Sequence, residues 1–154
     1  MVGVIVVERH EMIAATPERL FTYVTDFRRW IEWSPWEGLD TQMIRAYEGE
    51  PGTIGATYVW DGDKKAGAGQ MTIEALTPLS VSIDLVFTRP FKSSNRIDFI
   101  FEPVSDATRL TWRMESPKTF FARFFNLDKR VGPDFEKGLS SLATVTTSAT
   151  KSDI

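Results

Sequence analysis

Apolar and polar side chains alternate through six consecutive segments between residues 41 and 116, and turn-forming residues separate the segments. In residues 81–88, every second side chain from Val81 to Phe87 is large and apolar. A period of two residues is typical of a strand with one buried and one exposed face. Strands joined by short turns pair antiparallel with their neighbours. The pattern therefore predicts an antiparallel meander with one apolar and one charged face, built from residues 41–48, 54–60, 71–75, 81–88, 96–102 and 109–115.

The first 36 residues predict a further strand and two short helices. Residues 2–14 are rich in β-branched side chains and are typical of a strand. Thr16-Pro17-Glu18 marks a helix start, because Thr caps, Pro suits the first turn and Glu favours the positive end of the helix dipole. Asp26 is placed to cap a second short helix. Ser34-Pro35 ends that helix, because the residue before a proline avoids helical backbone angles.

The C-terminal part predicts one long helix. Apolar side chains recur at helical spacing from Phe120 to Leu142. Gly132-Pro133 interrupts this stripe and is expected to kink or restart the helix. Residues 144–154 are small and polar, and we expect a flexible tail there. We predict a single domain over residues 1–143.

Composition and charge exclude several classes of function. A chain of 154 residues is long enough to bury its own core. A net charge of -3 gives no field that would attract nucleic acid or an anionic membrane. There are no cysteines, so disulfides and thiolate chemistry are excluded. The first residues match neither a signal peptide nor a membrane span, so we expect a cytoplasmic protein without stable membrane insertion.

A sheet with one apolar face has to be covered, and only one long helix is available. A strongly curved sheet gripping a single helix leaves space between the two, and such space is where apolar ligands bind. The inward positions of the predicted strands are rich in aromatic rings. We therefore expect a cavity for a small apolar or aromatic molecule, with a wall made by Trp33, Trp36, Tyr58, Trp60, Met71, Phe87, Phe99, Trp112 and Phe121.

Several stretches of the chain resemble a known family. They are AATPERLFTYVTDFRRWIEWSPW (14–36), GTIGATYVWDG (52–62), GAGQMTI (67–73), TRLTWRME (108–115) and DFEKGLSSL (134–142). Together with the order of the predicted elements, they are similar to the bacterial polyketide cyclase/dehydrase-like branch of the SRPBCC, or START-like, superfamily. The resemblance covers about residues 3 to 143.

That resemblance implies an α+β helix-grip fold. A curved seven-stranded antiparallel sheet would wrap a long C-terminal helix, with two short helices after the first strand. It also implies binding of a small hydrophobic ligand such as a lipid or a polyketide between sheet and helix. The branch contains binding proteins and cyclases alike, so a cyclase or dehydratase using the same cavity is the alternative.

Three tryptophans, Trp30, Trp33 and Trp36, stand within seven residues. Buried aromatic rings mostly serve packing. The same rings would also suit the mouth of a cavity, and a third hypothesis has Trp33 and Trp36 docking a protein partner. The run from Phe120 to Phe125 also allows two interpretations. It is either a packed helix face or a lid that opens against a membrane.

No catalytic constellation is evident. His10 is the one histidine, and Glu8 lies two residues away on the same face, so the two would form an acid/base pair if that face points inward. Tyr58 and Arg113 are further candidates, although alternation places Arg113 on the outer face. The scattered carboxylates match no metal site and the glycines no phosphate-binding pattern. We therefore assign no catalytic residue, metal or cofactor, and expect a monomer or a homodimer.

Overall fold

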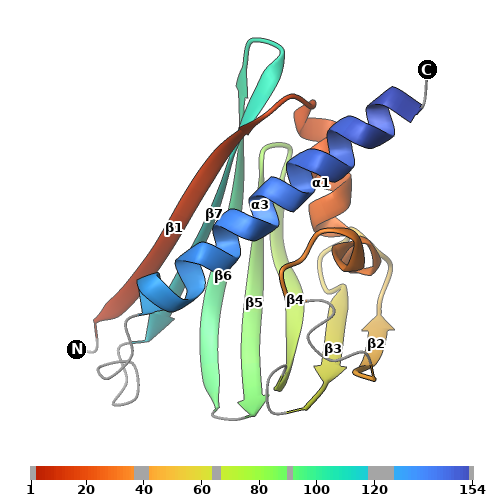
Figure 1. The fold of residues 1–154 in the computed structure, drawn as a ribbon. Helices are drawn as coiled ribbons and strands as arrows, with labels where there is room; N and C mark the ends of the chain where they lie inside the picture. Colours follow the sequence, from red (N-terminus) through yellow and green to blue (C-terminus); the bar gives the residue numbers. More distant parts are fainter. Residues whose placement is uncertain (1–2, 37–41, 64–66, 90–91, 118–126, 153–154) are drawn as a thin grey trace.

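The computed structural model describes residues 3–36, 42–63, 67–89, 92–117 and 127–152 (Figure 1). After the first strand come a helix and a 3-10 helix, then six strands and a long helix. The elements are β1 (Val4–Ile13), α1 (Pro17–Thr25), η1 (Phe27–Glu32), β2 (Ile44–Glu48), β3 (Thr57–Asp61), β4 (Ala68–Thr77), β5 (Ser80–Arg89), β6 (Ser93–Val104), β7 (Ala107–Pro117) and α3 (Leu127–Ser152).

The strands form one antiparallel sheet in the order β1-β7-β6-β5-β4-β3-β2. Strands β2 to β7 follow one another as a meander, and β1 pairs with β7 at the far edge. Helix α3 crosses one face of this sheet diagonally (Figure 1), and α1 contacts both α3 and β6. The architecture confirms the predicted α+β helix-grip fold.

Both predicted helix starts are confirmed. The Thr16 hydroxyl accepts a hydrogen bond from the Arg19 amide at 3.2 Å, which caps α1. The Asp26 carboxylate accepts one from the Arg28 amide at 3.1 Å and caps η1. The same residue ends α1, because its backbone N–H donates to the Thr22 carbonyl at 3.2 Å.

Helix α3 departs from the sequence pattern at two places. It continues through Pro133, so the expected restart is wrong and the expected kink stays a prediction. It also continues past residue 143 to Ser152, so the segment that we expected to be a flexible tail is helical in the structure, and its flexibility stays a prediction. Thr146 is fully buried, and the Arg19 side chain donates a hydrogen bond to its carbonyl at 3.0 Å. Packing against α1 therefore orders a segment whose composition alone predicts fraying.

The two faces of the sheet differ as predicted. The inner face, under α3, carries the large apolar side chains of the core. The outer face carries charged side chains that pair along the strands, such as Arg96 with Asp98 at 3.1 Å and Arg113 with Glu115 at 2.6 Å. Exposed pairs of this kind add little stability. Because the outer face is charged and exposed, chemistry that requires a dry environment has to take place on the inner face.

Candidate functional site

The centre of the inner face is a cluster of aromatic rings around Trp112. The Trp112 indole on β7 lies parallel to the Phe135 ring of α3, with 4.1 Å between ring centroids and 6° between planes. The other rings of this central aromatic cluster present their edges to it or tilt against it. They are Trp30, Trp33, Trp36 and Phe99.

Hydrogen bonds position the three neighbouring tryptophans. The indole N–H of Trp30 donates to the Val24 carbonyl at 2.8 Å, and that of Trp33 donates to the Tyr23 carbonyl at 3.1 Å. Both acceptors belong to α1, which ends at Thr25. The Trp36 indole donates instead to the Asp134 carboxylate of α3 at 3.3 Å. The triplet therefore ties α1 and η1 to the long helix.

A second group of rings lies beside the first, toward the β2 edge. This lateral aromatic group consists of Tyr47, Tyr58, Trp60 and Phe87. The Trp60 ring lies over Gly69, where a Cβ would come within 2.8 Å of its Cη2 atom. Phe27 links the group to η1, with 6.3 Å between its ring centroid and that of Tyr58.

The described members of the predicted ligand wall all lie on the inner face, but at different depths. Five of them are buried: Trp33, Tyr58, Met71, Phe99 and Trp112. Three are half-buried: Trp36, Trp60 and Phe87. Phe121 lies outside the described residues. The half-buried rings are the ones that a bound molecule reaches without disturbing the core, and the role of all nine stays a prediction.

Burial of Trp33 argues against the docking hypothesis. Its side chain is only 2% exposed, and its N–H is already paired. Trp36 is half-buried and bonded to α3. A partner would have to displace packed rings to reach this surface, which makes it unlike the exposed apolar patches that mark interfaces.

The inner face of β1 carries different polar residues from those we had considered. Val7 and Ile13 are buried, so odd-numbered residues of β1 face inward. Glu8 and His10 consequently point to the outer face, and the proposed acid/base pair lies outside the core. The inward polar residues are Arg9 and Glu11, a choice that the sequence pattern left open.

Arg9 and Glu11 are only partly buried. The Arg9 guanidinium lies 3.4 Å from the Glu136 carboxylate of α3. Gly132 makes room for it, because a side chain there would collide with the guanidinium. Burial raises the pKa of Glu11 above its ordinary value. These residues are the charged groups that β1 presents to the helix.

Two buried polar atoms have no hydrogen-bond partner among the described residues. They are Nε1 of Trp112 and Oγ of Ser116, and both side chains point inward from β7. Buried polar atoms are rarely left unpaired, so each such atom calls for an explanation. Sequence reasoning singled out the Trp112 ring but not its N–H, and missed Ser116 because a lone serine in a strand carries no pattern.

Two kinds of feature are absent from the described residues. No three His, Cys, Asp or Glu side chains lie together in the arrangement that a metal ion needs. No described helix combines the length and the apolar character required to cross a membrane.

Solved structures resemble the fold at low sequence identity. Norcoclaurine synthase from Thalictrum flavum, in complex with dopamine and hydroxybenzaldehyde, matches with TM-score 0.73 and 9% identity over 96% of this chain and 88% of that one. The Aha1 dimer from Colwellia psychrerythraea matches with TM-score 0.61 and 16% identity over 90% and 96%. A protein from Chromobacterium violaceum matches with TM-score 0.67 and 14% identity over 92% and 96%. At these identities the likeness concerns the fold alone.

Sequence comparison is more informative about the family. No significant match was found among curated proteins. A family model described as polyketide cyclase/dehydrase and lipid transport matches residues 4–147, nearly the whole chain. The chain therefore belongs to the polyketide cyclase/dehydrase and lipid transport family.

Proposed function

We propose that this protein binds a small apolar or aromatic molecule on the inner face of the sheet, under α3. The observation that carries this proposal is the lateral aromatic group, whose rings Trp60 and Phe87 remain half-buried beside a fully packed core. Aromatic rings that remain partly accessible beside a packed core are the kind of lining against which apolar ligands bind. The family description, with its lipids and polyketides, names molecules of the same apolar kind.

Burial of the ligand would supply the affinity. Apolar surface gains about 25 cal/mol per Å² when it leaves water. A molecule that buries roughly 200 Å² would gain about 5 kcal/mol before the entropic costs of association. Such affinities suit a carrier or a sensor that has to release its ligand.

Catalysis in the same cavity is the second candidate. It is favoured by Glu11, an inward carboxyl group whose pKa burial raises above its ordinary value, which is the direction of shift that general acid chemistry needs. Norcoclaurine synthase, which shares the fold, was solved with two small aromatic molecules. An enzyme of the cyclase or dehydratase kind would need Glu11, with Arg9 beside it, to reach the bound molecule.

Native mass spectrometry of gently purified protein, followed by titration with aromatic and lipid ligands, tests the proposal. Tryptophan emission reports binding, because Trp60 lies in the proposed wall. We expect Trp60→Ala and Phe87→Ala to weaken binding about tenfold, or about 1.4 kcal/mol, which lies within the roughly 0.5–1.5 kcal/mol that an aromatic contact contributes. Ile54→Ala, at an exposed loop position, is the matched control. A protein that is empty and unresponsive to the whole panel would overturn the proposal.

A further inference from the structure

The sheet forks between β6 and β7. Their pairing stops at Arg96 and Glu115. Strand β6 nevertheless continues to pair with β5 as far as Ser93, and β7 continues to pair with β1 as far as Pro117. The two strands diverge toward this end of the sheet (Figure 1). Within the fork, the facing edges of β6 and β7 are not joined by backbone strand pairing.

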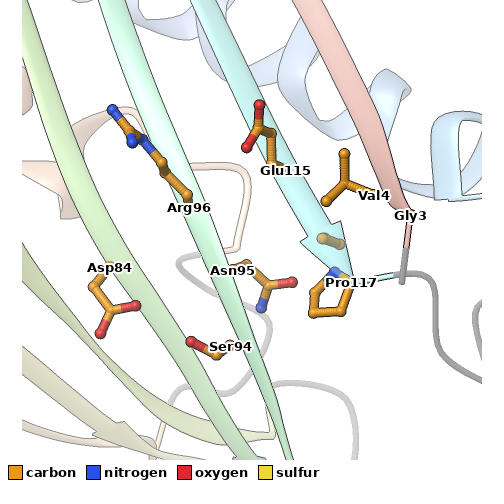
Figure 2. A pocket seen from close by; sticks show the side chains of 9 residues that line it. Gly3, Val4, Asp84, Ser94, Asn95, Arg96, Glu115 and Pro117 are labelled. Atoms are coloured by element: carbon orange, nitrogen blue, oxygen red, sulfur yellow. The ribbon is translucent and has the colours of Figure 1, made fainter. Parts of the chain in front are cut away.

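A pocket of about 250 Å³ occupies the fork (Figure 2). Its lining comes from both faces of the sheet, which places the pocket in the plane of the sheet. From the outer face come Asp84, Ser94, Arg96 and Glu115, and from the inner face Asn95 and Ser116, with Gly3, Val4 and Pro117 at the rim.

The two inner residues offer hydrogen-bonding atoms. Ser116 is 4% exposed, and its hydroxyl has no hydrogen-bond partner in the part of the chain that the structure describes. Asn95 is also buried, and its Nδ2 donates to the Leu85 carbonyl and to the Ser93 hydroxyl, each at 3.2 Å. This fixes the amide so that Oδ1 points across the fork toward β7 (Figure 2). The fork therefore presents one acceptor and one hydroxyl that lacks a partner.

Register connects the fork to the proposed ligand wall. Asn95 is paired with Leu85, which is paired with Met71 on the next strand. Ser93 is paired with Phe87. Asn95 and Phe87 are thus inner-face residues of neighbouring strands at the same end of the sheet, and Phe87 is the member of the lateral aromatic group nearest in the sheet to the fork.

Charge restricts what the fork accepts. Asp84, Arg96 and Glu115 line it, so the lining carries two negative charges and one positive. Arg96 is already held by Asp98, and Glu115 by Arg113. Among the described lining residues, an anionic group entering here would meet a net negative charge and no cation that lacks an acidic partner.

We propose that the fork receives the polar end of the cavity ligand, and that this end is an uncharged hydroxyl group. A hydroxyl donates to Oδ1 of Asn95 while it accepts from the hydroxyl of Ser116, which satisfies both atoms. The ligand class is then a neutral apolar or aromatic alcohol rather than a fatty acid or a phosphate ester. This inference rests on the proposed function, because the apolar body has to lie against the inner face.

Probes that share one ring system but differ in their polar group test the fork proposal separately from the proposed function. Naphthalene and pyrene are compared with their hydroxymethyl and carboxylic acid derivatives by fluorescence titration against the full-length protein. We expect each alcohol to bind about tenfold more tightly than its parent hydrocarbon, and each acid more weakly than the alcohol. Ser116→Ala should abolish the preference for the alcohol and leave hydrocarbon binding unchanged. Ser140→Ala, exposed on α3, is the control.

The outcomes are distinguishable. If hydrocarbons bind but alcohols show no advantage, or if Ser116→Ala keeps that advantage, the fork proposal is overturned while the proposed function stands. Acids that bind as tightly as alcohols overturn it as well. If no probe in either ring series binds, the proposed function and the fork proposal fall together.

Thermal unfolding of the ligand-free protein gives an independent check. Replacing an unpartnered buried hydroxyl removes a desolvation cost, so Ser116→Ala should raise the melting temperature while weakening alcohol binding. A hydroxyl that only supports the fold would show the reverse, a lower melting temperature and unchanged selectivity.

Discussion

The ring of Phe135 lies flat on the indole of Trp112, with 4.1 Å between centroids and 6° between planes. One ring comes from the long helix and the other from the sheet, and both are fully buried. Through this stack the helix packs on the sheet, and the rings of Trp33 and Trp36 contact Trp112 beside it. Stability and the shape of the inner face therefore depend on the same contact.

Phe135→Ala should lower the free energy of unfolding by about 3–5 kcal/mol, because it leaves a cavity against Trp112 that packed neighbours cannot fill. Urea denaturation followed by tryptophan emission measures this loss. Leu79→Ala, at a partly exposed turn, serves as the control and should change stability by less than about 1 kcal/mol. Equal effects of the two substitutions would contradict the central role of the stack.

Gly138→Ala should destabilise the protein although alanine favours helix. A Cβ at Gly138 would come within 2.8 Å of the Trp112 ring and 2.9 Å of the Pro35 ring, and neither can move freely. Overpacking of this kind costs about 1–3 kcal/mol, against a gain of about 1 kcal/mol in helix propensity.

Gly132→Ala provides the comparison in the same helix. There the neighbouring atoms belong to the Arg9 guanidinium, the far end of a flexible side chain. We expect a change in stability near zero, measured by thermal unfolding of both variants. A larger loss at Gly132 than at Gly138 would contradict this account of the helix contact.

Glu11→Gln should stabilise the protein near neutral pH and have little effect in acid. Burial raises the pKa of Glu11 above its ordinary value of 4.5. An acid with a raised folded-state pKa binds its proton more tightly when folded, so its stabilising contribution is lost as pH rises through the folded value. The uncharged glutamine avoids that loss.

Urea denaturation of wild type and Glu11→Gln between about pH 4 and pH 7 measures this difference. The two stabilities should converge at the acid end and separate as the pH rises. Glu48→Gln, exposed on the edge strand β2, is the control. Parallel stability curves for Glu11→Gln and wild type would show that this carboxyl is not desolvated.

Ending the chain after residue 143 should reduce stability by roughly 1–3 kcal/mol, because Thr146 is buried and its carbonyl accepts from Arg19. A chain that ends after residue 147 keeps these contacts and should match the full-length protein more closely. Thermal unfolding of the three lengths tests the point. If the shortest chain unfolds at the same temperature as the longest, the last part of α3 is the dispensable tail that composition predicted.

Local chemistry predicted much of the fold. Alternation specified the strands and their inner faces, since a period of two determines which side chains share a side. Capping side chains at Thr16 and Asp26 marked the helix starts, because a cap needs only neighbours in sequence. Alternation also predicted the strand members of the ligand wall, which belong to the core of the inner face or pack against it: Tyr58, Trp60, Met71, Phe87, Phe99 and Trp112. Trp33 and Trp36 were singled out instead by the spacing of the three tryptophans.

Other features depend on contacts between residues far apart in sequence. Strand β1 carries polar residues at both parities, so only its pairing with β7 turns Arg9 and Glu11 inward and Glu8 and His10 outward. The end of α3 is helical because it packs on α1. The fork arises because β6 before Arg96 pairs with β5 and β7 after Glu115 pairs with β1, and the two strands no longer pair with each other.

The sequence by itself therefore determined the strands, the helix starts and the aromatic character of the inner face, since these follow from spacing and from side chains that act on adjacent backbone. Only the tertiary structure decided how deeply each ring is buried, which charges face α3, and that the Ser116 hydroxyl finds no partner among the described residues. Burial and pairing are properties of the surroundings that a side chain acquires on folding, and no local pattern encodes them.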